Sequence, residues 1–240
     1  MIRVLLVDDH AIVRQGLRAV LETAPDIEVI GEAENGRQAV NETIRLQPNV
    51  VLLDLAMPLL NGVEAARQIA RAVPTARVLI LSSYSDDEHL RGAVEAGVAG
   101  YLQKESSSDI LLETVRGTHR GEALFSPPLS SHLLETWREG ARELHGAPTG
   151  RITFSGRQAE VLQLVAEGYP TKQIASLLSI GQKTVQKHRQ SVMNKLKLHK
   201  IAALTRYAVA AGVIESNREP DWLVKQPRSQ SPPGKKALMM

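Results

Sequence analysis

Residues 49–58 read NVVLLDLAMP, and this stretch decides the fold of the first half of the chain. Four apolar residues, Val50 to Leu53, run directly into one carboxylate, Asp54. A continuous Val/Leu run is typical of a strand buried on both faces, as in a parallel sheet. A buried, unpartnered carboxylate is costly, so Asp54 is either a solvated strand end or part of a site that needs its charge.

Four more apolar runs in residues 1–120 have the composition of strands, and an amphipathic segment follows each of the five runs. We expect strands at residues 2–8, 27–32, 50–54, 76–82 and 99–103. We expect helices at residues 11–23, 36–46, 62–72, 87–96 and 108–119. Five strand–helix units predict an α/β fold, a doubly wound parallel sheet with helices on both faces.

Charge is distributed unevenly along the 240 residues. Residues 1–120 carry 12 Lys or Arg against 17 Asp or Glu, whereas residues 151–240 carry 15 against 5. An acidic front and a basic back predict two domains, the second with a polyanionic partner.

The lack of cysteine excludes disulfides and thiolate sites. No apolar run is long enough for a membrane span, so we expect a cytoplasmic protein without a membrane partner.

Residues 151–214 lack β-rich runs and show helical periodicity instead. We expect four helices there, at residues 156–167, 171–178, 182–196 and 200–211. The second and third are joined by a three-residue turn, which is the layout of a helix-turn-helix.

The segment 121–150 is predicted to be a linker, partly helical near residues 129–144. It contains Pro127 and Pro128 and ends in a cluster of Gly and Pro before residue 151. The polar segment 215–240 is expected to be disordered.

Polar side chains end or follow four of the predicted strands, namely Asp8, Asp9, Asp54, Ser82 and Lys104. Ligands of open parallel sheets bind outside the carboxyl ends of the strands, so we expect these side chains to converge. Clustered carboxylates favour a hard divalent cation, and Mg²⁺ suits few carboxylates plus a phosphoryl oxygen. One carboxylate could then attack a phosphoryl group, whose oxygens the hydroxyl and the ammonium would hold. Polar strand ends are common in α/β proteins, but five of them at four strands favour a site. His10 follows the acid pair and is predicted to cap the first helix rather than to bind metal.

The motifs VDDHAIVRQGLRAVL, DLAMPLLNGVEA, LSSYSDDE and GYLQKESS resemble the receiver domain of bacterial response regulators, in particular the NarL/FixJ group, over residues 1–120. The resemblance implies a flavodoxin-like (βα)5 receiver domain. It also implies that Asp54 accepts a phosphoryl group from a sensor histidine kinase. The implied Mg²⁺ ligands are Asp8, Asp9, Asp54 and the backbone carbonyl of Ala56. The implied phosphoryl-binding and switch residues are Ser82, Lys104 and Tyr101.

Two positions near the phosphoacceptor bear on the lifetime of the phosphoryl group. Ala56, two residues after Asp54, has no side chain that could orient an attacking water. Tyr84, two residues after Ser82, is bulky. We therefore hypothesise slow self-dephosphorylation, over minutes or longer.

The third helix of the back half presents a basic and amide-rich face, and no acid occurs between Glu167 and Glu215. The residues of this face are Gln182, Lys183, Thr184, Gln186, Lys187, Arg189, Gln190 and Lys195. Lys and Arg neutralise phosphates, while Gln and Lys can reach base edges in the major groove. A basic, solvated helix face is ordinary by itself, but the acid-free segment and the two-helix layout favour DNA binding.

The motifs FSGRQAEVLQLVAEG, KQIASLL, KTVQKHRQSVMNKLKL and ALTRYAV resemble the LuxR-type helix-turn-helix over residues 152–214. The resemblance implies that Lys183, Gln186, Lys187 and Gln190 face the groove and that Thr184 and Arg189 contact phosphates. It implies dimerisation through the last helix; core packing of Leu204, Ala208 and Ala211 is the alternative. Pro170 and Gly181 stand where a Ser is frequent, and Gln replaces a frequent Glu at three positions. These departures leave the operator sequence open.

The two resemblances together predict a two-component response regulator that binds double-stranded promoter DNA, with a homodimer formed on phosphorylation or on DNA. The only expected catalysis is self-catalysed phosphotransfer and dephosphorylation. A haloacid-dehalogenase-type phosphatase would need a second acid where Ala56 stands. The alternative is an unphosphorylated receiver-like transcription factor controlled by binding of a protein or a ligand.

Overall fold

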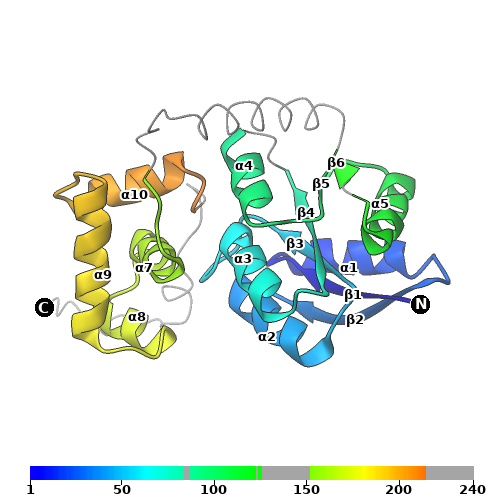
Figure 1. Cartoon of the computed structure of the whole chain (residues 1–240), viewed down its shortest axis with the longest axis horizontal. Helices are drawn as coiled ribbons and strands as arrows, with labels where there is room; N and C mark the ends of the chain where they lie inside the picture. The colour runs from blue at the N-terminus through cyan, green and yellow to red at the C-terminus, as the bar shows by residue number, and fades with distance from the viewer. Residues whose placement is uncertain (84–86, 123, 126–151, 215–240) are drawn as a thin grey trace, which may run out of the picture.

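A computed structural model describes residues 1–83, 87–122, 124–125 and 152–214 of the chain (Figure 1). These residues form an α/β unit followed by an all-helical unit. The helix predicted near residues 129–144 and the tail at 215–240 lie outside the described residues, as does Tyr84. Nothing in the described ranges is a helix long and apolar enough to span a membrane.

The α/β unit contains a parallel sheet whose strand order is β2-β1-β3-β4-β5-β6. The strands are β1 (Ile2–Val7), β2 (Ile27–Ala33), β3 (Val50–Asp54), β4 (Arg77–Ser82), β5 (Gly100–Gln103) and β6 (Leu124–Phe125). The helices are α1 (Ala11–Leu21), α2 (Gly36–Leu46), α3 (Gly62–Ala72), α4 (Asp87–Glu95) and α5 (Ser108–Arg120). The five predicted strands and the doubly wound arrangement are confirmed. The two-residue β6 was not predicted, because so short a segment carries no periodicity.

Two apolar layers cover the sheet, one on each face. Leu53 and Ile80 belong to the layer under α2, α3 and α4, whereas Leu52 and Leu79 belong to the layer under α1 and α5. Every residue of β3 is buried as a result, from Val50 to Asp54. The continuous apolar run of β3 therefore reflects burial on both faces, as predicted.

Four helices make up the second unit: α7 (Gly156–Ala166), α8 (Thr171–Leu177), α9 (Gln182–Lys195) and α10 (Ile201–Ala210). A capping box starts α7, where the Ser155 side chain accepts from the Gln158 amide and the Gln158 side chain accepts from Ser155. By contrast, Pro170 and Gly181 occupy the N-cap positions of α8 and α9 without any side-chain cap bond. A cap bond is therefore missing at both helix starts of the helix-turn-helix.

Helix α10 is anchored in the core of the helical unit. Leu204 and Ala208 are fully buried there, and Ala211 is half-buried. For Leu204 and Ala208 the structure thus supports core packing, which was the alternative to a role in dimerisation. A dimer through α10 would have to use other residues, such as the exposed Ile201.

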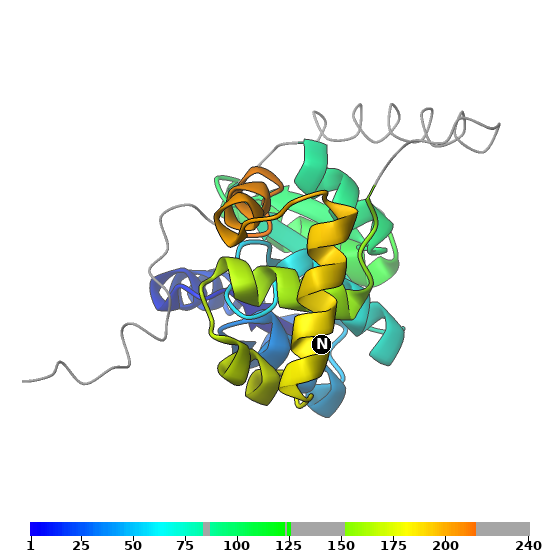
Figure 2. The ribbon, with the colours of Figure 1, turned by 90° about the vertical axis from the view of Figure 1, so that its left-hand side faces the viewer.

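Helix α7 lies between the sheet unit and α9 (Figure 1). A view from the side of the helical unit shows α9 running along the front, with the sheet unit behind it (Figure 2). The sheet unit therefore packs on the side of the helical unit that faces away from α9.

Candidate functional site

Asp54 and Asp8 lie next to each other at the carboxyl edge of the sheet. Asp54 is the last residue of β3 and Asp8 directly follows β1, in a register that pairs Val7 with Leu53. Both are buried. Lys104, just after β5, places Nζ 2.7 Å from Oδ2 of Asp8 and 3.1 Å from Oδ2 of Asp54. The structure thus brings together two of the predicted carboxylates and the predicted ammonium.

The third carboxylate, Asp9, adjoins Asp8 through His10. His10 Nδ1 lies 3.3 Å from Asp8 Oδ1 and 3.1 Å from Asp9 Oδ1. His10 occupies the N-cap position of α1, but its side chain makes no cap bond, so the predicted capping role is wrong for the side chain. It is directed at the acid pair, and one ligand atom from each of the three residues lies within 4.8 Å of the others.

Arg14 positions Asp8 and was not foreseen from the sequence. Its Nη1 donates to the backbone carbonyl of Asp8 at 2.6 Å, and its Nε donates to Glu32 at 3.1 Å. The side chain is buried, although α1 is otherwise amphipathic. Oδ1 of Asp8 also accepts from the backbone amide of His10 at 2.8 Å, so both the backbone and the carboxylate of Asp8 are held.

The remaining predicted site residues, Ser82, Tyr101 and Ala56, lie on β4, on β5 and in the loop after β3. Ser82 ends β4 fully buried, and its carbonyl accepts from the backbone amide of Lys104 at 2.9 Å. Tyr101 lies inside β5, opposite Ile80 in the register, and its side chain is fully buried in the core. Ala56 is half-buried in the loop that follows β3.

Burial and charge together set the protonation of the pocket. Burial raises the pKa of Asp54 to about 6, against the opposing effect of the Lys104 charge and with a further rise from Asp8. Burial lowers the pKa of Lys104, but the charges of Asp54 and Asp8 outweigh it, so that pKa lies above its ordinary value. At neutral pH the Lys104 ammonium therefore lies beside an Asp54 carboxylate that is mostly ionised.

The donor atoms of the pocket suit a hard divalent cation. One ligand atom from each of Asp8, Asp9 and His10 lies within 4.8 Å of the others, and Asp54 adjoins this group through Lys104, which contacts both Asp8 and Asp54. Carboxylate oxygens are the ligands that Mg²⁺ prefers in proteins. The residues present therefore fit Mg²⁺, with these three carboxylates as candidate ligands.

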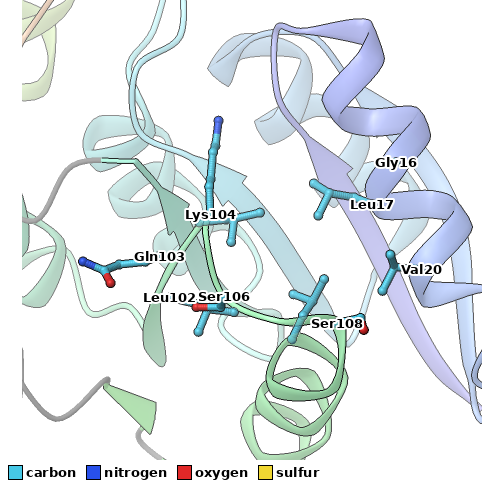
Figure 3. Close-up of a pocket in the computed structure, with 10 residues that line it drawn as sticks. Gly16, Leu17, Val20, Leu102, Gln103, Lys104, Ser106 and Ser108 are labelled. Atoms are coloured by element: carbon cyan, nitrogen blue, oxygen red, sulfur yellow. The ribbon is translucent and has the colours of Figure 1, made fainter.

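A small hollow lies beside the acidic pocket, between α1 and the segment from β5 to α5 (Figure 3). Leu17 and Val20 of α1 face it from one side, and Leu102 and Ser108 line the other. Lys104 is the member that it shares with the acidic pocket. Its largely apolar lining contains no carboxylate, so it is not an extension of the cation site.

The predicted nucleic-acid interface is formed by α9. Val185, Val192 and Met193 anchor the helix in the core. On the opposite face, Lys183, Thr184, Gln186, Lys187 and Gln190 are exposed, and Arg189 is half-buried. Gln190 Nε2 donates to Asn194 Oδ1 at 2.8 Å. The helix therefore presents the predicted basic and amide-rich face to the solvent.

Lys195 differs from the rest of the predicted DNA-facing set. Its Nζ donates to the carbonyl of Thr153 and to Oε1 of Gln158, both at 2.8 Å. The ammonium also lies 5.8 Å from the centre of the Phe154 ring. Lys195 thus ties the end of α9 to the start of α7. The sequence could not indicate this, because the contact partners lie about 40 residues earlier.

An acidic pocket on a doubly wound sheet, joined to an exposed basic helix-turn-helix, defines a signal-responsive DNA-binding protein. Two family profiles match the chain. Residues 4–116 match the response regulator receiver domain, and residues 153–208 match the bacterial regulatory proteins of the luxR family.

Curated relatives agree with both matches. The chain is 38% identical over 196 residues to the transcriptional regulatory protein LiaR of Bacillus subtilis, covering 82% of this chain and 91% of LiaR. It is 36% identical over 214 residues to the response regulator protein VraR of Staphylococcus aureus, covering 89% of this chain and 99% of VraR. The chain therefore belongs to the DNA-binding response regulators with a receiver domain and a LuxR-type helix-turn-helix.

Solved structures of the RcsB response regulator share the fold. One, from Salmonella typhimurium, has a TM-score of 0.59 at 26% identity and covers 88% of this chain and 98% of that chain. Another, described as two RcsB dimers bound to two parallel DNAs, has a TM-score of 0.52 at 25% identity, with coverage of 87% and 98%.

Proposed function

We propose that Asp54 accepts a phosphoryl group from a sensor histidine kinase and that this modification controls binding of promoter DNA by α9. The observation that carries the proposal is the convergence of Asp8, Asp54 and Lys104 at one edge of the sheet. The domains would be a receiver at 1–120, a linker at 121–150 and a DNA-binding domain at 151–214.

The chemistry follows from the residues of the pocket. A carboxylate oxygen of Asp54 forms a bond to phosphorus while the bond from phosphorus to the leaving group breaks, and the leaving group keeps the electron pair. Lys104 already contacts Oδ2 of Asp54, so its ammonium is placed to stabilise the transferred phosphoryl oxygens. Ser82 would donate its hydroxyl to the same group, and Tyr101 would respond as a switch.

Mg²⁺ would be held by Asp8, Asp9, Asp54 and the Ala56 carbonyl. When bound, the cation offsets the repulsion between these carboxylates and the incoming phosphoryl group. The buried Asp54, whose pKa is raised to about 6, is mostly ionised at neutral pH and can therefore act as the nucleophile.

The DNA contacts would come from two kinds of residue on α9. Lys183, Gln186, Lys187 and Gln190 would reach base edges in the major groove, while Thr184 and Arg189 would contact phosphates. The exposure of most of these side chains supports this assignment. Lys195 is exposed and its partners on the α7 side are uncharged, so its charge would add to the positive potential while its ammonium stays tied to Thr153 and Gln158. Because a structure described as RcsB dimers on DNA is among the relatives, we infer a homodimer that reads two half-sites.

DNA binding with and without phosphorylation tests the proposal. Full-length protein is treated with acetyl phosphate and Mg²⁺ and titrated against a mixed-sequence duplex and against duplexes selected from a random library. Tighter binding after treatment is expected for the natural protein and not for Asp54→Ala. Equal tightening in both proteins would show that the effect does not depend on Asp54, and no tightening in either would favour the alternative, a regulator controlled by binding of a protein or a ligand.

A further inference from the structure

Arg14 of α1 is a buried cation that is bonded to the main chain of the acid pair. Its Nη1 donates to the carbonyl of Asp8 at 2.6 Å, and this bond is itself buried. Lys104, by contrast, donates to the carboxylate oxygen Oδ2 of Asp8 at 2.7 Å. The two cations therefore act on the same residue in different ways, because Lys104 contacts its charge and Arg14 contacts its backbone.

The position of Arg14 in the helix explains how its side chain reaches Asp8. Arg14 is the fourth residue of α1, and its backbone amide donates to the carbonyl of His10 at 3.1 Å. Side chains of an α-helix lean toward the N-terminus of the helix, so a long side chain near its start projects back over the segment that enters it. That segment contains Asp8 and Asp9.

The bond from Arg14 fixes the peptide group that joins Asp8 to Asp9. A peptide group is planar, so the direction of the Asp8 carbonyl also sets the direction of the Asp9 amide. The backbone rotations on either side of this plane determine how the two side chains leave the main chain. On its other side Asp8 is held by β2, because its amide donates to the carbonyl of Ala33 at 3.2 Å. The main chain of Asp8 is thus fixed at both its amide and its carbonyl.

Glu32 of β2 compensates the buried guanidinium and ties it to the sheet. Its Oε2 accepts from Arg14 Nε at 3.1 Å, and its Oε1 accepts from Arg18 Nε at 2.8 Å. In the parallel register Glu32 lies opposite Leu6, close to the end of β1. Nη2 of Arg14 also donates to Oε1 of Glu34 at 3.4 Å. Contacts with the end of β2 therefore hold Arg14 in the place from which it reaches Asp8.

Arg18, one turn further along α1, shares the acidic partner of Arg14 but not its contact with Asp8. It pairs with Glu32 at 2.8 Å and with Glu22 at 3.0 Å. Its side chain is 34% exposed, whereas that of Arg14 is 9% exposed. Arg18 is therefore a matched control for Arg14, with the same residue type, the same helix and a common partner.

Charge and position predict opposite effects of Arg14 on cation binding. A guanidinium near the acid pair repels a divalent cation, so removal of its charge alone would tighten binding of Mg²⁺. Loss of its bond would instead leave the buried Asp8 carbonyl without this donor and release the Asp8–Asp9 peptide group. Groups that orient the direct ligands of a metal commonly change its affinity by about 10- to 100-fold. The effect of position outweighs that of charge, because Glu32 already offsets the guanidinium.

We propose that Arg14 is a positioning residue for the Mg²⁺ site. By holding the Asp8–Asp9 peptide group, it keeps both carboxylates oriented for the cation and thereby sets the Mg²⁺ affinity of the phosphoacceptor pocket. Arg14 itself touches neither the cation nor the phosphoryl group. This inference rests on the proposed function, in which Asp8 and Asp9 hold Mg²⁺.

Calorimetric titration of the full-length chain with Mg²⁺ tests the proposal. Arg14→Leu should raise the Kd at least about tenfold, whereas Arg18→Leu should stay within about twofold of the natural chain. Circular dichroism verifies that each variant is folded. Arg14→Lys keeps the charge and can give a single bond, so its Kd should lie between those of the natural chain and Arg14→Leu. If Arg14→Leu does not fold, Arg14→Lys carries the test, with Arg18→Lys as its control.

The sign of the change in affinity decides between position and charge. Unchanged or tighter binding of Mg²⁺ by the folded Arg14 variants would overturn the proposal. Equal weakening in the Arg14 and Arg18 variants would overturn it as well, because Arg18 does not contact Asp8.

The Mg²⁺ dependence of phosphorylation separates positioning from a general loss of structure. With acetyl phosphate, the Mg²⁺ concentration that gives half of the maximal rate should rise about as much as the Kd in Arg14→Leu. The maximal rate should stay within about threefold, because Asp54 and Lys104 are unchanged. A lower maximal rate at an unchanged half-saturating concentration would contradict a role in binding Mg²⁺.

Failure of this proposal can be told apart from failure of the proposed function. A natural chain that binds Mg²⁺ but is not phosphorylated on Asp54 would contradict the proposed function alone, since the calorimetric comparison of Arg14 and Arg18 variants does not require phosphorylation. A natural chain that binds no Mg²⁺ would contradict both. Phosphorylation of Asp54 together with equal Kd values in Arg14→Leu and Arg18→Leu would overturn the role of Arg14 alone.

Discussion

Lys104 donates from Nζ to Oδ2 of Asp8 at 2.7 Å, across the carboxyl edge of the sheet. The two residues are 96 positions apart in the sequence and meet because β1 and β5 are parallel and end at the same edge. The ammonium also contacts Asp54, so it neutralises part of a buried acidic pocket. A pocket built in this way should respond strongly to pH and to the loss of any one member.

The raised pKa of Asp54 predicts a pH-dependent cost to stability. Below pH 3.8 the carboxyl is protonated in both the folded and the unfolded chain. Between pH 3.8 and about 6 the folded chain holds the proton more tightly, so stability falls as pH rises, and above about 6 the whole penalty is present. The penalty is on the order of 3 kcal/mol at most.

Urea unfolding of the natural chain and of Asp54→Asn, with a chelator present, measures this penalty. The natural chain should lose stability relative to Asp54→Asn from pH 4 to pH 7, because asparagine does not titrate. Added Mg²⁺ should reduce the difference at pH 7 by neutralising the carboxylates. A difference that stays constant across this pH range would contradict the burial of an ionisable Asp54.

The N-cap of α9 offers a stabilising substitution. Gly181 has no side chain to cap the helix, its φ is −68°, and an added Cβ would meet only Thr184 Oγ1, at an ordinary contact distance of 3.8 Å. Gly181→Ser should stabilise the helical domain by about 1 kcal/mol, since it adds a cap and restricts the unfolded chain. Thermal unfolding measures the gain. Gly181→Ala isolates the chain-restriction effect, and equal gains for serine and alanine would show that no cap forms.

The two roles proposed for α9 predict different salt dependences. Arg189→Gln should lower the slope of log affinity against log salt concentration by about 1, because one phosphate contact is lost. Gln186→Ala should leave the slope unchanged and reduce the preference for a selected duplex over a mixed-sequence one. Fluorescence anisotropy over a range of salt concentrations measures both. The assignment of roles would be wrong if the two variants changed the slope equally.

The side chain two residues after the phosphoacceptor predicts the lifetime of the phosphoryl group. Ala56 is half-buried beside Asp54 and has no polar group with which to orient water. We expect the phosphorylated natural chain to decay over minutes or longer, and Ala56→Asn to decay faster, once acetyl phosphate is removed. The decay is measured by phosphate-affinity electrophoresis. Equal decay of the two proteins would show that another feature sets the lifetime.

The sheet and the acidic pocket could be predicted because each depends on a short-range signal. The run from Val50 to Leu53 identifies a strand buried on both faces, and a polar residue at its end lies at the binding edge by topology alone. The amino-acid sequence alone is therefore enough to group Asp8, Asp54, Ser82 and Lys104.

Other features depend on contacts between distant segments and leave no such signal. Arg14 lies within a predicted amphipathic helix, and its bond to the Asp8 carbonyl depends on how α1 turns back over β1. Lys195 was grouped with its basic neighbours, because its contact with Thr153 requires the packing of α7 against α9. The left-handed backbone of Leu59 is opposite to what its residue type favours, and it is closed by a local bond from the Leu60 amide to the Pro58 carbonyl at 2.8 Å.

The most direct test of the central claim is peptide-level mass spectrometry of full-length protein incubated with acetyl phosphate and Mg²⁺. The account predicts that the peptide containing Asp54 gains the mass of one phosphoryl group, that chelation of Mg²⁺ abolishes the gain, and that Asp54→Ala shows none. A phosphoryl group found on another residue, or no gain in protein that is folded and saturated with Mg²⁺, would contradict the account.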